Sequence, residues 1–176
     1  ISSVALFRTF VGAASTCRCI DVQDSWSTFK AAVATAESIG RLTGTRPHVM
    51  FCPFHINKEH GERTNHAKEK LFLSSPVHLQ CFKSNPDDRC IIESTGPVCI
   101  KKMRCTDVVG IDSDDVWIQG FTMKGAQIGS ITIEALRKGV KLIDMEFEKN
   151  SSPEETAGAI VVAGMQTSTE VYDSVF

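Results

Sequence analysis

Three aspartates that lie close together, Asp112, Asp114 and Asp115, are the residues of this chain best suited to catalysis. They precede an apolar run that begins at Val116. Glycoside hydrolysis uses two carboxyl groups, one protonated and one ionised, placed on opposite sides of the scissile bond. Proton abstraction by a lyase would also need a positioned base, and no motif joins these acids to an Arg or Lys. The favoured interpretation is therefore a solvated turn, with catalysis as the alternative.

A second group with suitable chemistry is Cys52, His55, His60 and His66. Thiolate and imidazole ligands suit zinc, which takes four of them in a tetrahedron. The intervals of two, four and five intervening residues match no familiar zinc finger, and most of the group falls in a polar segment. Solvated histidines with no metal are therefore the favoured interpretation, and a zinc-dependent cytosolic module is an alternative.

Cysteine is abundant for a chain of 176 residues. The seven cysteines are Cys17, Cys19, Cys52, Cys81, Cys90, Cys99 and Cys105. Cys81 and Cys90 flank a turn-forming Asn-Pro-Asp-Asp segment, and a disulfide across so short a loop would stabilise by roughly 2–3 kcal/mol. Weaker expectations pair Cys52 with Cys17 or Cys19, and Cys99 with Cys105. The alternative is a set of buried thiols in a cytosolic protein, and an odd total leaves one thiol without an internal partner.

The overall composition removes several classes of function. Lys plus Arg is 19 and Asp plus Glu is 21, a formal charge of −2. Nucleic acid is not an expected partner, because phosphate binding needs a clustered positive surplus. No stretch reaches the ~20 apolar residues of a membrane-spanning helix. The chain carries no nucleophile elbow and no glycine loop for phosphates or dinucleotides, so no cofactor is expected. Asn150-Ser-Ser forms a sequon for N-glycosylation.

One helix is expected ahead of the strands. Residues 24–40 carry apolar side chains at intervals of three and four, which places Trp26, Phe29, Val33 and Ala36 on one face. Asp24 or Ser25 would cap the start of this helix, and Gly40 would end it. A strand is expected over residues 48–52 and a solvated loop over residues 57–70.

The second half of the chain is rich in strands. Ile and Val number 10 in residues 1–90 and 19 in residues 91–176, and β-branched residues favour extended backbone. Residues 77–82 (VHLQCF) and 116–121 (VWIQGF) are nearly the same hexapeptide. Steps of 24 and 29 residues continue the series: Val116, Ile118, Phe121, Met123; Val140, Leu142, Met145, Phe147; Thr169, Val171, Ser174, Phe176. Ile131 and Ile133 likewise become Ile160 and Val162.

Within each repeat, the apolar positions fall at i, i+2, i+5 and i+7, so the two-residue alternation slips by one in the middle. A straight strand with this slip would turn its side chains over, whereas a chain that bends there keeps both halves pointing inward. Repeats of this length with short strands and a corner predict a β-solenoid. A sandwich is disfavoured by the absence of Asn-Gly and Asp-Gly turns, and a βαβ fold by the absence of a helical period after residue 90.

With these repeats, the sequence resembles a known group, the right-handed parallel β-helix proteins of the pectin-lyase-like superfamily. The resemblance covers about residues 24–176 and rests on coils such as Val116–Gly125 and on the order of an early helix, a strand ending at Cys52-Pro53, and stacked coils. The Cys81–Cys90 segment is similar to a cysteine loop of secreted, uncharacterised β-helix proteins. The resemblance implies a helix that covers the open end of the stack, but the second aspartate pair and Gly-His step of β-helix hydrolases have no match here.

We therefore expect an all-β, right-handed parallel β-helix with an N-terminal capping α-helix, truncated at its C-terminal end. Residues 24–176 would form this domain, with the capping helix at 24–40, and residues 1–23 would be either an ordinary N-terminal segment or the remnant of a leader. The expected role is a non-catalytic, extracellular or cell-surface domain that binds glycan or matrix or has a structural role. The alternative is a polysaccharide lyase or glycoside hydrolase that uses the aspartates at 112–115.

Overall fold

The fold was analysed in a computed structural model, which describes residues 19–59, 70–95, 108–126, 129–150, 159–164 and 166–176. These residues form the helix α1 (Trp26–Thr43) followed by short strands. The strands are β1 (His48–Phe51), β2 (Phe54–Glu59), β3 (Leu71–Leu73), β4 (Val77–Cys81), β5 (Cys90–Thr95), β6 (Val109–Ile111), β7 (Val116–Gln119), β8 (Phe121–Lys124), β9 (Ile131–Ile133), β10 (Val140–Ile143), β11 (Glu146–Glu148), β12 (Ile160–Val162) and β13 (Thr169–Tyr172).

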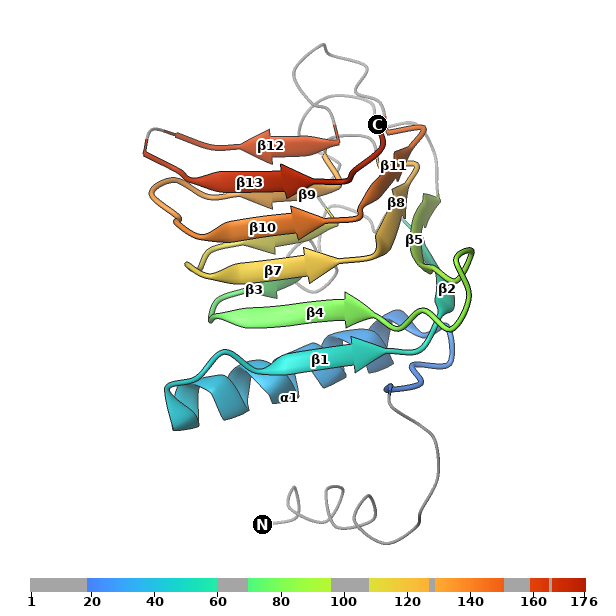
Figure 1. The fold of residues 1–176 in the computed structure, drawn as a ribbon, viewed down its shortest axis with the longest axis horizontal. Helices are drawn as coiled ribbons and strands as arrows, with labels where there is room; N and C mark the ends of the chain where they lie inside the picture. The colour runs from blue at the N-terminus through green and yellow to red at the C-terminus, as the bar shows by residue number, and fades with distance from the viewer. Residues whose placement is uncertain (1–18, 60–69, 96–107, 127–128, 151–158, 165) are drawn as a thin grey trace, which may run out of the picture.

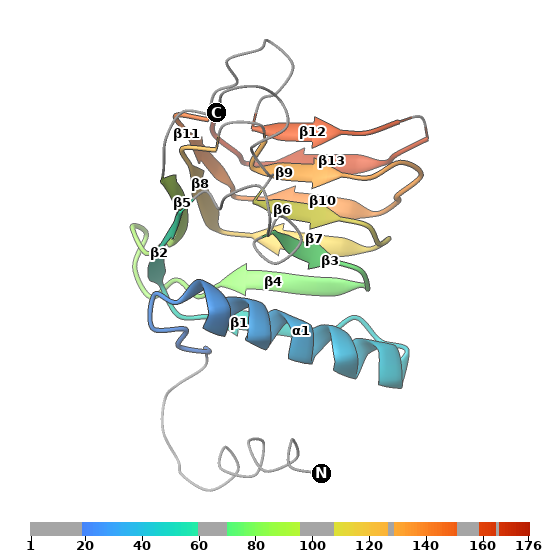
Figure 2. The ribbon, with the colours of Figure 1, turned by 180° about the vertical axis from the view of Figure 1, so that it is seen from behind.

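The strands stack into three parallel sheets (Figures 1 and 2). Sheet A has the order β1-β4-β7-β10-β13, sheet B the order β2-β5-β8-β11, and sheet C the order β3-β6-β9-β12. Each turn of the chain therefore gives one strand to each sheet before it starts the next turn one level higher. This arrangement is a parallel β-solenoid, as the repeats predict.

The pairing register confirms the predicted columns. Val140 pairs with Thr169, and β10 pairs with β7 at the 24-residue step that places Val116 below Val140. In the other sheets, Phe147 pairs with Met123, and Ile131 and Ile133 pair with Ile160 and Val162. The inward side chains of the inner coils are buried and form one core.

The predicted bend lies between sheets A and B. Gly120, Asp144 and Asp173 occupy the bend in three successive coils, and each has a positive φ, of 76°, 50° and 47°. A residue in this left-handed conformation turns the chain sharply, which explains how the alternation slips without exposing the core. In the coil below Gly120, the bend is replaced by residues 82–89, a longer loop that leaves the stack between β4 and β5.

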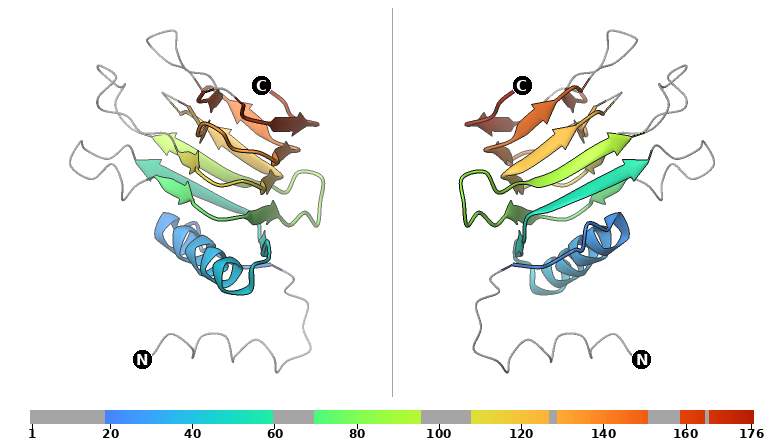
Figure 3. Two further views of the ribbon diagram at one scale, coloured as in Figure 1. Left: turned by 90° about the vertical axis from the view of Figure 1, so that its left-hand side faces the viewer. Right: turned by 90° about the vertical axis from the view of Figure 1, so that its right-hand side faces the viewer.

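Helix α1 lies across the first end of the stack (Figure 3). Ser25 caps it by accepting from the backbone N–H of Thr28, as predicted. The predicted end at Gly40 is wrong, because the helix continues to Thr43 and Gly44 supplies the left-handed cap with φ of 67°. Gly40 is required for packing instead, since a Cβ there would lie 2.8 Å from the ring of Pro47.

The helix is joined to the coils by rings and by one buried acid. Phe29 of α1 packs against Phe51, Phe54 and Phe121, with ring centroids 4.9, 5.4 and 6.2 Å away. Glu37 is 5% exposed, and its Oε1 accepts from the backbone N–H groups of the two serines at 74–75, at 2.7 and 2.9 Å. A buried carboxylate needs such donors, so this contact fixes the helix to the corner that precedes β4.

One strand lies where a loop is expected. Residues 57–59 belong to β2, so the predicted loop at 57–70 begins too early, and its residues 60–69 lie outside the described part of the chain. The strand was missed because Asn57, Lys58 and Glu59 are polar, although Ile56 beside them is fully buried and Asn57 is exposed.

Candidate binding face

The outward side of sheet A carries an ordered set of rings, amides and charges. Inward and outward side chains alternate along each of its strands, so parallel register places outward residues of successive coils directly above one another. We call this surface the sheet A face, and it faces the viewer in Figure 1. Its strand residues are His48, Met50, His78, Gln80, Trp117, Gln119, Lys141, Ile143, Glu170 and Tyr172, and the ion pair of Arg46 with Asp115 lies beside them.

Three rings form the first part of this face. His48 and His78 pair in register and stack with their ring centroids 4.3 Å apart and their planes 9° from parallel. Trp117 continues the column, with its ring 5.3 Å from that of His78 in an edge contact. Cross-strand ring contacts of this kind stabilise a sheet, so the column has a structural role as well as an exposed surface.

Two cations lie against Trp117. The guanidinium carbon of Arg46 is 3.6 Å from the ring centroid, and the ammonium of Lys141 is 5.1 Å from it. Arg46 also donates to Asp115 at 2.5 Å, which neutralises its charge. Trp117 is therefore held by cation–π contacts as well as by its neighbours in the sheet.

At the far end of the face lies an ion pair, to which a tyrosine hydroxyl is hydrogen-bonded. Lys141 contacts Glu170 at 3.0 Å, and the hydroxyl of Tyr172 donates to the same carboxylate. The hydrogen bond from Tyr172, then that from Lys141, lowers the pKa of Glu170. The contact with Glu170 raises the pKa of both Lys141 and Tyr172. Tyr172 remains 46% exposed, so its ring is open to a ligand.

Glutamines lie beside the histidines. His48 Nε2 lies 2.8 Å from Gln80 Oε1, and His78 Nε2 lies 3.3 Å from Gln119 Oε1. Each histidine therefore pairs with a glutamine of the coil above. An amide whose oxygen is engaged keeps its N–H groups to donate, so the rows offer hydrogen-bonding groups beside rings.

The outward side of sheet B differs in character. Lys124 lies 3.9 Å from Glu93 and 3.7 Å from Glu148, and His55 lies 2.8 Å from Glu93. A second group adds Arg89, which contacts Glu146 at 3.7 Å. We call this surface the sheet B face; it consists mainly of ion pairs.

The aspartates that the sequence singles out form contacts between coils. Asp112 accepts from Arg137 at 2.6 Å, and Asp114 accepts from the backbone N–H of Lys138 at 2.9 Å. Asp115 accepts from Arg46 of the sheet A face. Each carboxylate thus has a separate partner, which lies in a neighbouring coil or, for Asp115, in the segment before β1. This arrangement favours the interpretation as a coil corner over that as a catalytic pair.

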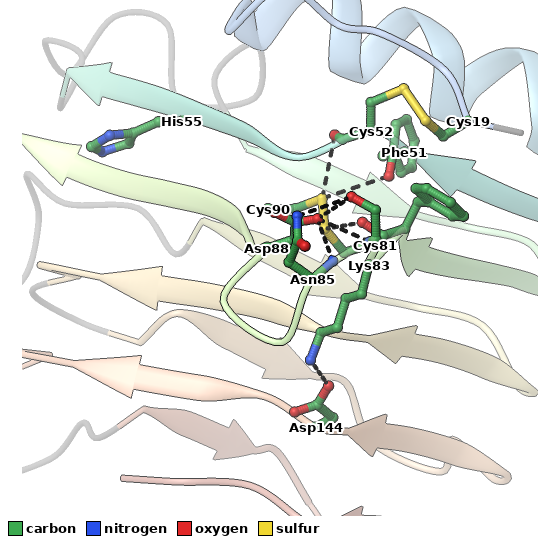
Figure 4. The surroundings of a disulfide bond; sticks show 12 residues. Cys19, Phe51, Cys52, His55, Cys81, Lys83, Asn85, Asp88, Cys90 and Asp144 are labelled. Carbon is green, nitrogen blue, oxygen red and sulfur yellow. Dashed lines mark hydrogen bonds and ion pairs between the residues drawn. A yellow bond between two sulfur atoms is a disulfide. The ribbon is translucent and has the colours of Figure 1, made fainter. Parts of the chain in front are cut away.

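The cysteines form two disulfides within the described residues (Figure 4). Cys19 is joined to Cys52, and Cys81 is joined to Cys90, nine residues on. The second bond closes the loop of residues 82–89 at its base. Cys17, Cys99 and Cys105 lie outside the described residues, as does any pairing between them.

The structure describes two members of the alternative zinc set. The sulfur of Cys52 is bonded to Cys19, so it is not available as a thiolate ligand in this set. His55 lies against Glu93 on the sheet B face, and His60 and His66 fall outside the described residues. Within the ranges that the structure describes, no three His, Cys, Asp or Glu side chains form a group that could hold a metal ion.

The sequon asparagine has a structural contact. Asn150 accepts from the backbone N–H of Ala126 at 2.8 Å, and its Nδ2 donates to the carbonyl of Met123 at 2.9 Å. The amide therefore joins two coils after sheet B. Its glycosylation stays a prediction, and the two serines that follow it lie outside the described residues.

The sheet A face was not identified from the sequence. The two similar hexapeptides contain its signal, since His78 and Trp117 share one outward column and Gln80 and Gln119 share the next. The i, i+2, i+5, i+7 pattern of the repeat lies at inward positions, so by itself it does not identify the outward columns. Arg46 precedes the first strand, so only the folded structure brings it to Trp117.

Comparisons with known proteins found no match: no family model, no curated protein and no solved structure matches the chain. The one helix in the described ranges is not long and apolar enough to cross a membrane.

Proposed function

We propose that this protein is a non-catalytic, extracellular β-helix domain that binds a glycan through the sheet A face. The observation that carries the proposal is the column of rings formed by His48, His78 and Trp117, with the amides of Gln80 and Gln119 in the next outward column. Sugars present apolar C–H faces and hydroxyl edges, which pair with aromatic rings and with amide or imidazole groups, respectively. A chain of sugars could contact several coils at once, because the coils repeat at the strand spacing of about 4.8 Å.

The disulfides support the proposed location. Structural disulfides form and persist in oxidising compartments and are rare in the cytosol. Cys19–Cys52 joins the segment before α1 to the first coil, and Cys81–Cys90 joins β4 to β5 in the second, so both stabilise the folded domain. The finer assignment, a right-handed helix of the pectin-lyase-like kind, is part of this proposal and fits the strong preference of parallel crossovers for that hand.

The proposal is tested by glycan-array binding with a variant from each face. We expect the wild type to bind a defined set of glycans and Trp117→Ala to lose at least about tenfold in affinity, or about 1.4 kcal/mol. Gln119→Ala is a second variant that removes an amide without removing a ring. Lys124→Ala on the sheet B face is the matched control and should bind like the wild type.

Two results would contradict the proposal. The first is the absence of any glycan hit for protein whose folding has been verified by circular dichroism. The second is release of unsaturated or reducing sugar ends by the wild type and loss of that activity in Asp114→Asn, which would establish an enzyme at the 112–115 corner.

A further inference from the structure

The charges of the sheet A face are balanced within the described part of the chain. Arg46 is paired with Asp115 at 2.5 Å, and Lys141 is paired with Glu170 at 3.0 Å. An acidic polysaccharide would require a surplus of positive charge that these pairs do not provide. Apart from its histidines, the face therefore carries no surplus charge, which suits a ligand without charge.

The histidine pair carries the remaining titratable groups of this face. His48 of β1 and His78 of β4 stack at 4.3 Å, and the ring of His78 also contacts Trp117 of β7. The charged groups around the pair are Arg46, which precedes β1, and Lys141 of β10 beyond Trp117, while Asp115 is bound to Arg46. Among the described residues, no carboxylate forms an ion pair with either imidazole.

Titration of His78 follows from these surroundings. Burial lowers the pKa of His78, and the nearby charges of His48 and Arg46 lower it further, whereas the hydrogen bond with Gln119 opposes the shift. Since the ordinary value is 6.5, this imidazole is neutral at neutral pH. Uptake of a proton would place like charges across neighbouring strands, which destabilises a pair.

We propose that the sheet A face binds an uncharged glycan while His78, stacked on His48, is neutral and releases it when His78 is protonated. This inference rests on the proposed function and adds to it the class of ligand and its control by pH. In each histidine, Nε2 donates to a glutamine oxygen, which leaves Nδ1 as an acceptor for a sugar hydroxyl. Protonation converts that acceptor into a donor and adds charge to the stack.

The direction in which the affinity changes with pH follows from thermodynamic linkage between ligand binding and protonation. A ligand that prefers the neutral imidazole binds more weakly as the pH falls through the pKa of His78, by at most about tenfold per pH unit for one proton. By the same linkage, bound glycan must lower the pKa of His78 further. A role of the histidines in folding alone would not produce this second effect.

The experiment measures affinity at about pH 7 and about pH 5, where histidine changes its charge. The uncharged probes are β-1,4-linked oligosaccharides of glucose, mannose and xylose, and heparin is the charged probe. We expect an uncharged probe to bind roughly tenfold more weakly at the lower pH. An NMR titration of the histidine ring protons, with and without that probe, measures the pKa of His78 directly.

Two variants and one control isolate the pair. His78→Gln removes the titrating group and should make the affinities at the two pH values nearly equal. His48→Gln removes a neighbouring charge, so the pKa of His78 should rise and release should occur at a higher pH. His55→Gln is the matched control on the sheet B face and should keep the pH dependence of the wild type.

The outcomes separate the two proposals. Binding of an uncharged probe that is independent of pH, or stronger at low pH, overturns this inference and leaves glycan binding intact. Binding of heparin alone likewise overturns the uncharged class. If folded protein binds no probe at either pH and no glycan on the array, the proposed function fails as well.

Discussion

The faces of sheets A and B rest on the same core but are built from different interactions. On the sheet A face, His48, His78 and Trp117 form a column of rings, and its two cations are each paired. On the sheet B face, Lys124 lies between two glutamates, and Arg89 lies near a third. The difference shows that a solenoid fixes where outward side chains lie without fixing their chemistry.

The two kinds of surface should respond differently to their surroundings. Ring stacking depends on contact area and is little affected by salt, whereas exposed ion pairs are screened within about 10 Å at 0.1 M salt. Four variants test this comparison, from the shared interior outward.

The largest effect is expected inside the stack. Phe121 is 1% exposed and contacts Phe29, Phe51 and Phe54, so it supports both faces and the cap together. Phe121→Ala should lower the free energy of unfolding by about 3–5 kcal/mol, measured by denaturant titration. Phe72→Ala, at a ring that is 46% exposed, is the control and should cost less than about 1 kcal/mol.

The boundary between the two faces comes next. Cys81 and Cys90 close the loop that separates β4 from β5, and the double change Cys81→Ser with Cys90→Ser should cost roughly 2–3 kcal/mol. Thermal unfolding of oxidised protein measures the loss. A cost near zero would mean that the loop is held by its own hydrogen bonds, in which Asp88 accepts from Ser84 and Asn85.

On the sheet A face, Arg46→Ala removes a guanidinium from above Trp117 and leaves Asp115 without its cation. The expected cost is about 1–2 kcal/mol, because a cation–π contact and an ion pair are lost together. Arg46→Lys should recover only part of it, since an ammonium does not stack as a planar group. Equal stability of Arg46→Ala and wild type would show that the contacts of Arg46 with Trp117 and Asp115 do not stabilise the fold.

The smallest effect is expected on the sheet B face. Lys124→Ala should cost less than about 1 kcal/mol at low salt, because ion pairs that remain partly exposed contribute little. Its cost should shrink further at high salt, while that of Arg46→Ala should change less. Chemical unfolding by urea at two salt concentrations checks both; a larger salt effect for Arg46→Ala would reverse the comparison of the faces.

The sequence was enough to predict the stack, but not the surface. Val116 and Val140 could be aligned because buried positions are mostly apolar and because the slip in alternation requires a bend, and Thr169 followed from the 29-residue step that also relates Ile131 to Ile160. The end of α1 was misplaced because Gly40 is needed for packing, and the sequence alone does not distinguish such a glycine from one that caps a helix. The sheet A face was missed because outward residues are free to vary, so their alignment acquires meaning only when the register is known.

The bend between sheets A and B has a practical consequence for protein engineering. The coil that contains β7 and β8 turns there on Gly120 alone. The coil beneath it inserts residues 82–89 at this point, and its strand β5 still pairs in register with β2 and β8. The same corner therefore accommodates chains of very different length above one unchanged scaffold. A foreign peptide grafted between Ser84 and Asp88 would be displayed as a disulfide-closed loop, and libraries of such inserts could be built without redesigning the rungs.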